Sequence, residues 1–150
     1  MLSGREHNME LPYLDNINAG MISPLGLAYI GDAVYDVYIR SYVLGKGNTG
    51  VNKLHKTSTG YVSAKAQSYI IHNLADSLTE EETAVYKRGR NAHSNTSAKN
   101  ADVVDYRHAT GFEALLGYLY ITGNQQRLSE IIEMAINIIN DSKTKAINNK

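Results

Sequence analysis

The sequence of 150 residues contains no cysteine. It therefore has no disulfide framework, no thiolate zinc site and no cysteine nucleophile, which agrees with a reducing cytosol. No stretch approaches the ~18 consecutive apolar residues that a membrane span requires. The first residues, MLSGREHNMELPYL, also lack the charged-then-apolar pattern of a signal peptide. We expect a soluble cytoplasmic protein with no membrane partner.

Acidic residues are missing from two long stretches, although the formal net charge of the chain is zero. Residues 37–75 and 83–101 carry lysine and arginine but no aspartate or glutamate. Basic side chains that face phosphates gain from counterion release, so these stretches suit a nucleic acid even on a neutral protein. Scattered, solvated surface charges would explain the same pattern equally well.

The length suits a single domain over residues 1–150, and 43% hydrophobic and 20% charged residues are ordinary values for a soluble globular chain. Apolar residues recur with helical spacing, and no alternating polar and apolar run persists long enough for a strand. The sequence therefore predicts an all-α fold, a helical bundle.

Capping and turn signals divide this bundle. Ser23 and Pro24 begin a helix that we expect to reach about Leu44, followed by a loop over the glycine-rich residues 45–50. Further helices are expected around Leu54, over 61–75, for about three turns after a capping box at Thr79 and Glu82, over 103–122 up to Gly123, and from Leu128 to Ile139. The basic stretch 89–101 predicts a loop, and residues 141–150 a frayed tail.

Two carboxylates interrupt otherwise apolar helices. On a helical wheel Asp32 falls among Ala28, Tyr35 and Ile39, on a helix that is apolar nearly all round. Glu113 shares a face with Ala109, Leu116 and Tyr120. An isolated buried charge is very costly, so each carboxylate must be paired, hydrogen-bonded or bound to a metal.

Two carboxylates on central helices can meet and hold a hard divalent cation. The alternative is structural: Asp32 would pair with Arg40 or Arg107, and Glu113 with a tyrosine hydroxyl.

Both carboxylates lie in motifs of a known family. Ile30-Gly31-Asp32-Ala33-Val34 resembles the L-G-D-A/S-V signature of the ribonuclease III superfamily. Glu113-Ala114-Leu115-Leu116-Gly117 resembles its second acidic motif, E-A-L-I/L-G. The chain between them is similar to the Mini-III subgroup, which consists of the catalytic domain without a double-stranded-RNA-binding domain.

This resemblance implies a Mg2+-dependent endoribonuclease that cuts double-stranded RNA, with Asp32 and Glu113 as the catalytic and metal-binding residues. Within the subgroup, the substrate is the precursor of large-subunit (23S) ribosomal RNA. The resemblance also implies a homodimer, whose interface we expect on the first helix with Tyr35, Tyr38 and Tyr42. Candidate RNA-binding residues are Lys53, Lys56, Lys65, Gln67, Lys87, Arg88, Arg90, His93 and Lys99.

The chain departs from ordinary ribonuclease III proteins at two positions. Those proteins carry further carboxylates four residues before the motif aspartate and three before the motif glutamate, where this chain has Ala28 and Thr110. Water and RNA phosphate, or a neighbour such as Asp36 or Asp105, would then complete the Mg2+ shell.

Two other functions compete with this assignment. One is a non-catalytic RNA-binding module on the same fold. The other is a metallohydrolase of the His-Asp type, but the chain lacks the His-Asp dipeptide that such a site requires.

Overall fold

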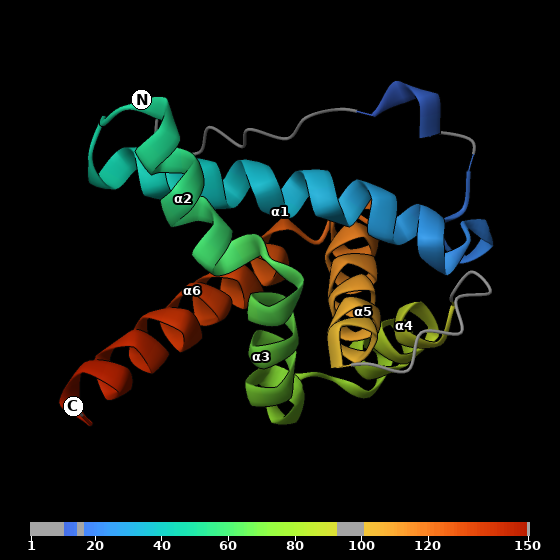
Figure 1. Ribbon diagram of the computed structural model, residues 1–150. Helices are drawn as coiled ribbons and strands as arrows, with labels where there is room; N and C mark the ends of the chain where they lie inside the picture. The colour runs from blue at the N-terminus through green and yellow to red at the C-terminus, as the bar shows by residue number, and fades with distance from the viewer. Residues whose placement is uncertain (1–10, 15–16, 93–100, 150) are drawn as a thin grey trace.

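A computed structural model describes residues 11–14, 17–92 and 101–149, and their regular structure is entirely helical (Figure 1). The helices are α1 (Pro24–Lys46), α2 (Val51–Val62), α3 (Ala64–Leu74), α4 (Glu80–Asn91), α5 (Ala101–Ile121) and α6 (Gln125–Asn148), with 3-10 turns at Pro12–Leu14, Ala19–Met21 and Ala75–Ser77. The predicted all-α class is confirmed. Among the described helices, none combines the length and the apolar character that crossing a membrane needs.

Most expected helices form, with changes at their ends. Ser23 caps α1 by accepting a hydrogen bond from the Gly26 amide, as predicted, and α1 continues to Lys46. The helix expected over 61–75 is interrupted at Ser63, whose side chain caps α3 by accepting from the Ala66 amide. Of the expected loop over 89–101, residues 89–91 extend α4 and residues 93–100 lie outside the described part of the chain.

Most of the tail expected to fray, residues 141–150, is helical in the described part of the chain, because α6 continues to Asn148. Contacts with α2 hold this end of the helix. The Tyr61 hydroxyl donates to Asn140 Oδ1 at 2.7 Å. The Lys143 ammonium lies 4.3 Å from the centre of the Tyr61 ring.

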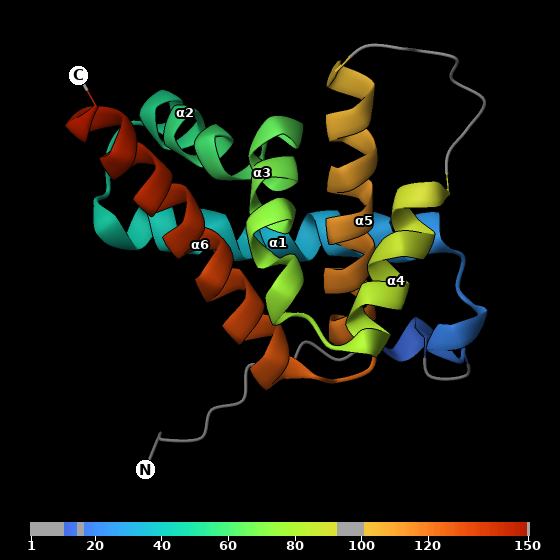
Figure 2. The same ribbon diagram turned by 90° about the horizontal axis from the view of Figure 1, so that it is seen from below.

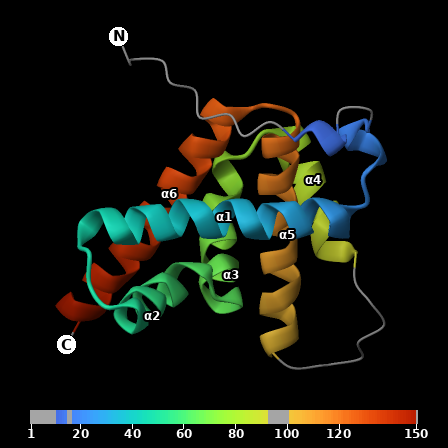
Figure 3. The ribbon, with the colours of Figure 1, turned by 90° about the horizontal axis from the view of Figure 1, so that it is seen from above.

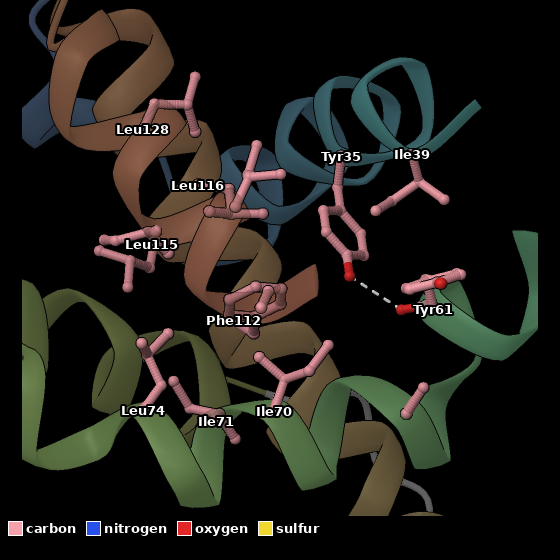
Figure 4. Packing of buried hydrophobic residues seen from close by; sticks show 14 of the residues in the cluster. Tyr35, Ile39, Tyr61, Ile70, Ile71, Leu74, Phe112, Leu115, Leu116 and Leu128 are labelled. Carbon is pink, nitrogen blue, oxygen red and sulfur yellow. Dashed lines mark hydrogen bonds between the residues drawn. The ribbon is translucent and has the colours of Figure 1, made fainter. Parts of the chain in front are cut away.

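Helix α5 lies at the centre of the bundle and packs against α1, α3 and α4. Helix α1 crosses the other helices, and α3 and α5 lie side by side across one side of it (Figures 1, 2 and 3). Phe112 and Leu116 of α5 face Tyr35 of α1 and Ile70 of α3 in the buried core (Figure 4). Although the sequence of α1 is apolar nearly all round, the helix is not buried all round, since Tyr29 and Val37 are exposed.

The predicted capping box at the start of α4 is present and has an additional partner. The Glu82 side chain accepts from the Thr79 amide at 2.9 Å, and Glu82 also binds Arg127 of α6 through both carboxylate oxygens, at 2.8 and 2.9 Å. This forked ion pair lowers the pKa of the buried Glu82 carboxyl group. Arg127 also donates to the Ser77 carbonyl at 2.7 Å, so it fastens the start of α6 to the turn before α4.

Candidate active site

The site is formed where α1 crosses α5, and two glycines allow the crossing. A Cβ atom on Gly31 would lie 1.7 Å from the Glu113 carbonyl oxygen, and one on Gly117 would lie 1.9 Å from the Leu27 carbonyl oxygen. The backbones of the two helices are thus in direct contact, which only glycine permits at these positions. The glycines of the two motifs therefore bring their neighbouring acids, Asp32 and Glu113, to the same place.

Asp32 and Glu113 form a carboxylate pair. The pKa of the Glu113 carboxyl group is raised from 4.5 to about 8, chiefly by burial and in addition by a hydrogen bond with Asp32 and by the negative charge of Asp32. Asp32 itself is exposed, so its expected position among the buried side chains of α1 is wrong. It lies at the edge of the buried face of α1, where its carboxylate reaches both Glu113 and solvent.

Gln67 of α3 holds one side of this pair. Its side-chain Nε2 donates to the Val62 carbonyl at 2.9 Å and makes a longer contact of 3.5 Å with Glu113 Oε2. The Val62 carbonyl can only accept a hydrogen bond, so it must face the N–H groups of the Gln67 side-chain amide, and this fixes the orientation of that amide. Gln67 is only 2% exposed, so the prediction that it contacts RNA does not fit its position; it contacts Glu113 inside the protein.

The residue types of the pair fit a hard divalent cation. Glu113 and Asp32 place two carboxylates side by side, and Gln67 Oε1 is a buried acceptor with no hydrogen-bond partner in the described structure. Mg2+ commonly uses one or two protein carboxylates and keeps several water molecules. Within the described residues no third histidine, aspartate or glutamate joins the pair to make a larger ligand cluster.

The other candidate partners of the two acids lie elsewhere. Asp36 pairs with Arg40 at 3.0 Å, so it is not a third ligand and Arg40 is not the partner of Asp32. Glu113 interacts with Asp32 and Gln67 rather than with a tyrosine hydroxyl, and the structural alternative is therefore wrong in its partners. In the part of the chain that the structure describes, Asp105 joins no metal-binding cluster either.

At the two positions that lack the additional family carboxylates, this chain has buried residues that pack in the interior. Ala28 is buried against Val85 and Ala114. Thr110 is buried, and its hydroxyl donates to the Tyr106 carbonyl at 2.9 Å. Both side chains therefore contribute to the interior, and among the described residues the site has two acids.

Comparison with known proteins identifies the family. Residues 25–124 match the Ribonuclease III domain family. "Mini-ribonuclease 3" of Clostridium tetani is 54% identical over 81% of this chain and 81% of the relative. That of Enterococcus faecalis is 50% identical over 83% of this chain and 96% of the relative. The chain belongs to the Mini-ribonuclease 3 family.

The Mini-ribonuclease 3 assignment makes the chain an endoribonuclease with a ribonuclease III domain. A crystal structure of a Fusobacterium nucleatum protein supports the same fold. It superposes with a TM-score of 0.69 at 31% sequence identity, over 78% of this chain and 93% of that one.

The basic residues proposed for RNA binding are spread over this Mini-ribonuclease 3 domain. Exposed candidates are Lys53 and Lys56 on α2, Lys65 on α3, and Lys87 and Arg88 on α4, while Arg90 is half-buried. Helix α2 lies near one end of α1 and α4 near the other (Figure 3). These residues therefore do not form one compact patch. His93 and Lys99 lie outside the described residues.

Proposed function

We propose that this endoribonuclease cuts double-stranded RNA in a Mg2+-dependent reaction at Asp32 and Glu113. The observation that carries the proposal is the meeting of these two carboxylates at the glycine crossing of α1 and α5. Membership of the Mini-ribonuclease 3 family further favours the precursor of large-subunit (23S) ribosomal RNA, in the cytoplasm, as the natural substrate.

Each residue of the site has a separate task in this proposal. Asp32 and Glu113 would hold the metal ion, and Gln67 keeps Glu113 Oε2 in place. When bound, Mg2+ supplies positive charge beside the phosphate and lowers the pKa of a water molecule. The nucleophile is water, which agrees with a chain that contains no cysteine.

A cleavage assay tests this function. The pure protein is incubated with a duplex RNA, such as a stem of the ribosomal precursor, with Mg2+ and in parallel with a chelator. We expect cutting with Mg2+ and binding alone without it. Binding without cutting under both conditions would indicate the non-catalytic RNA-binding module, and neither binding nor cutting would overturn the proposal.

We also propose a symmetric homodimer formed through α1. Tyr35 is buried in the core and is therefore not available to the interface expected from the sequence, whereas Tyr38 and Tyr42 pack against that core and stay partly exposed. The exposed large apolar side chains of α1 are instead Leu25, Tyr29, Val37 and Leu44. Large exposed apolar side chains gathered on one helix favour an interaction surface, and a two-fold axis would pair this face with itself.

Sedimentation measures the predicted assembly. The wild-type protein should sediment at micromolar concentration with twice the mass of one chain, and Val37→Arg should shift it toward the monomer because the new charge would be buried in the interface. Val37 is 63% exposed in the single chain, so the substitution should not disturb the fold. A wild-type protein that is entirely monomeric would contradict the dimer.

A further inference from the structure

A small pocket lies between the end of α4 and the first half of α5. It has a volume of about 170 Å3, and the described residues that line it are Arg90, Asn91, Val104 and Arg107. That volume is several times the ~30 Å3 that one water molecule occupies in the liquid. Two arginines therefore face a space that accepts a group larger than water.

Neither arginine has a carboxylate partner among the described residues. Arg40 and Arg127 form ion pairs, whereas Arg90 and Arg107 form none. Arg107 Nε is buried and has no hydrogen-bond partner there. An unpaired buried donor is unfavourable, and more so when it belongs to a charged group, so the Arg107 guanidinium, which lines the pocket, favours an acceptor that binds there.

Arg90 is already held in position on the other side of the pocket. Its Nε donates to Asn91 Oδ1 at 3.1 Å, and its guanidinium carbon lies 5.6 Å from the centre of the Tyr86 ring. A guanidinium group that is oriented in this way loses less side-chain freedom when it binds a ligand. Guanidinium groups have donors only, and their fork matches the oxygens of a phosphate group.

We propose that Arg90 and Arg107 form a phosphate site whose ligand is a backbone phosphodiester of the RNA duplex. This assignment rests on the proposed function. Arg107 precedes Glu113 by six residues on α5, which places it about 9 Å away along the helix axis and about 120° around it. The bound phosphate is therefore not the one that is cut, but it lies within reach of the same duplex.

RNA binding in a chelator isolates this site from cleavage. Arg107→Gln should weaken the binding of a duplex RNA about tenfold or more, since hydrogen bonds to charged groups are lost. The slope of log affinity against log salt should become shallower by about one unit. Arg107→Lys should keep the salt slope but recover only part of the affinity, because lysine keeps the charge and loses the fork. Lys145→Gln, on the exposed end of α6, is the charge-matched control and should bind as the wild type does.

Thermal melting separates a binding role from a structural one. Arg107→Gln should melt at or above the wild-type temperature without RNA, because it removes an unpaired buried donor. A lower melting temperature together with unchanged RNA affinity would show a structural role and overturn the phosphate site.

Three further outcomes are distinct. If inorganic phosphate stabilises the wild type but not Arg107→Gln while the two bind RNA equally, the ligand is a free anion and the assignment to RNA is wrong. If the wild type binds no duplex RNA at all, the proposed function fails together with this inference. If the wild type binds RNA and Arg107→Gln binds it with the same affinity and salt slope, only the phosphate site is overturned.

Discussion

Glu113→Gln is expected to abolish the cleavage of duplex RNA and to stabilise the metal-free protein at pH 8. The first effect follows from the loss of one of the two carboxylates proposed to hold the metal. A metal ion at a phosphoryl centre is worth several kcal/mol of transition-state stabilisation, so the cleavage rate should fall at least about 100-fold. Single-turnover cleavage with saturating Mg2+ measures this fall in the cleavage rate.

The second effect follows from the raised pKa of Glu113, which changes from 4.5 to about 8 on folding. Below pH 4.5 the carboxyl group is protonated in both states. Between these two values the unfolded chain loses the proton while the folded chain keeps it, so folding stability falls as the pH rises. Above about pH 8 the folded protein carries a buried carboxylate beside Asp32. Glutamine has nearly the same shape and no charge, so it avoids this cost.

The size of the stabilisation is limited by partial exposure of the pair to solvent, and we expect roughly 1–3 kcal/mol at pH 8. In a domain of this size that corresponds to a melting temperature about 3–10 °C higher. The difference between variant and wild type should disappear near pH 4. Glu133→Gln, which removes an exposed carboxylate on α6, serves as the control.

Adding Mg2+ should then reverse the order of stability, because only the wild type keeps both proposed ligands. A variant that melts at or below the wild-type temperature at pH 8 in a chelator would contradict the protonated pair. Near-wild-type cleavage would remove Glu113 from the proposed metal site. The two measurements therefore test the electrostatics and the chemistry of Glu113 separately.

The meeting of Asp32 and Glu113 follows from sequence motifs, but their surroundings do not. Helical spacing places Asp32 beside Ala28 and Ile39, yet it cannot show where the buried face of α1 ends, because that limit depends on the path of α5. The contact between Gln67 and Glu113 likewise joins two helices far apart in the chain. A local pattern of apolar residues contains no information about such a partner.

The ends of the helices likewise depend on contacts that the local sequence does not predict. The capping box of Thr79 and Glu82 is local and was predictable, whereas the binding of Glu82 by Arg127 spans 45 residues and was not. The polar composition after Ile139 favours fraying, but the contact of Asn140 with Tyr61 docks that part of α6 against α2. Tertiary contacts therefore override local preference at both places.

Gly31→Ala should cause the largest loss of folding stability among single-methyl additions at the described glycines. The new Cβ would lie 1.7 Å from the Glu113 carbonyl oxygen, and a backbone atom in the middle of α5 cannot move aside alone. Helix α1 would have to shift relative to α5, which disturbs the packing of Tyr35 against Phe112. Overpacking of this severity exceeds the usual ~1–3 kcal/mol, so we expect a loss of about 3–5 kcal/mol.

The same shift should separate the two carboxylates and lower activity even in molecules that fold. A misplacement of about 1 Å can cost a factor of about 100 in rate. Gly45→Ala is the matched control, because its added methyl meets nothing within 4 Å and lies in the last turn of the same helix, where alanine favours helix by up to about 1 kcal/mol.

Urea unfolding of both variants, with cleavage measured at a temperature where each is folded, tests this prediction. Gly117→Ala should behave like Gly31→Ala, since its Cβ would lie 1.9 Å from the Leu27 carbonyl oxygen on the opposite side of the crossing. Wild-type stability in both crossing variants would mean that α1 and α5 do not touch at Gly31 and Gly117. Reduced stability with full activity would mean that the crossing holds the fold together without setting the geometry of Asp32 and Glu113.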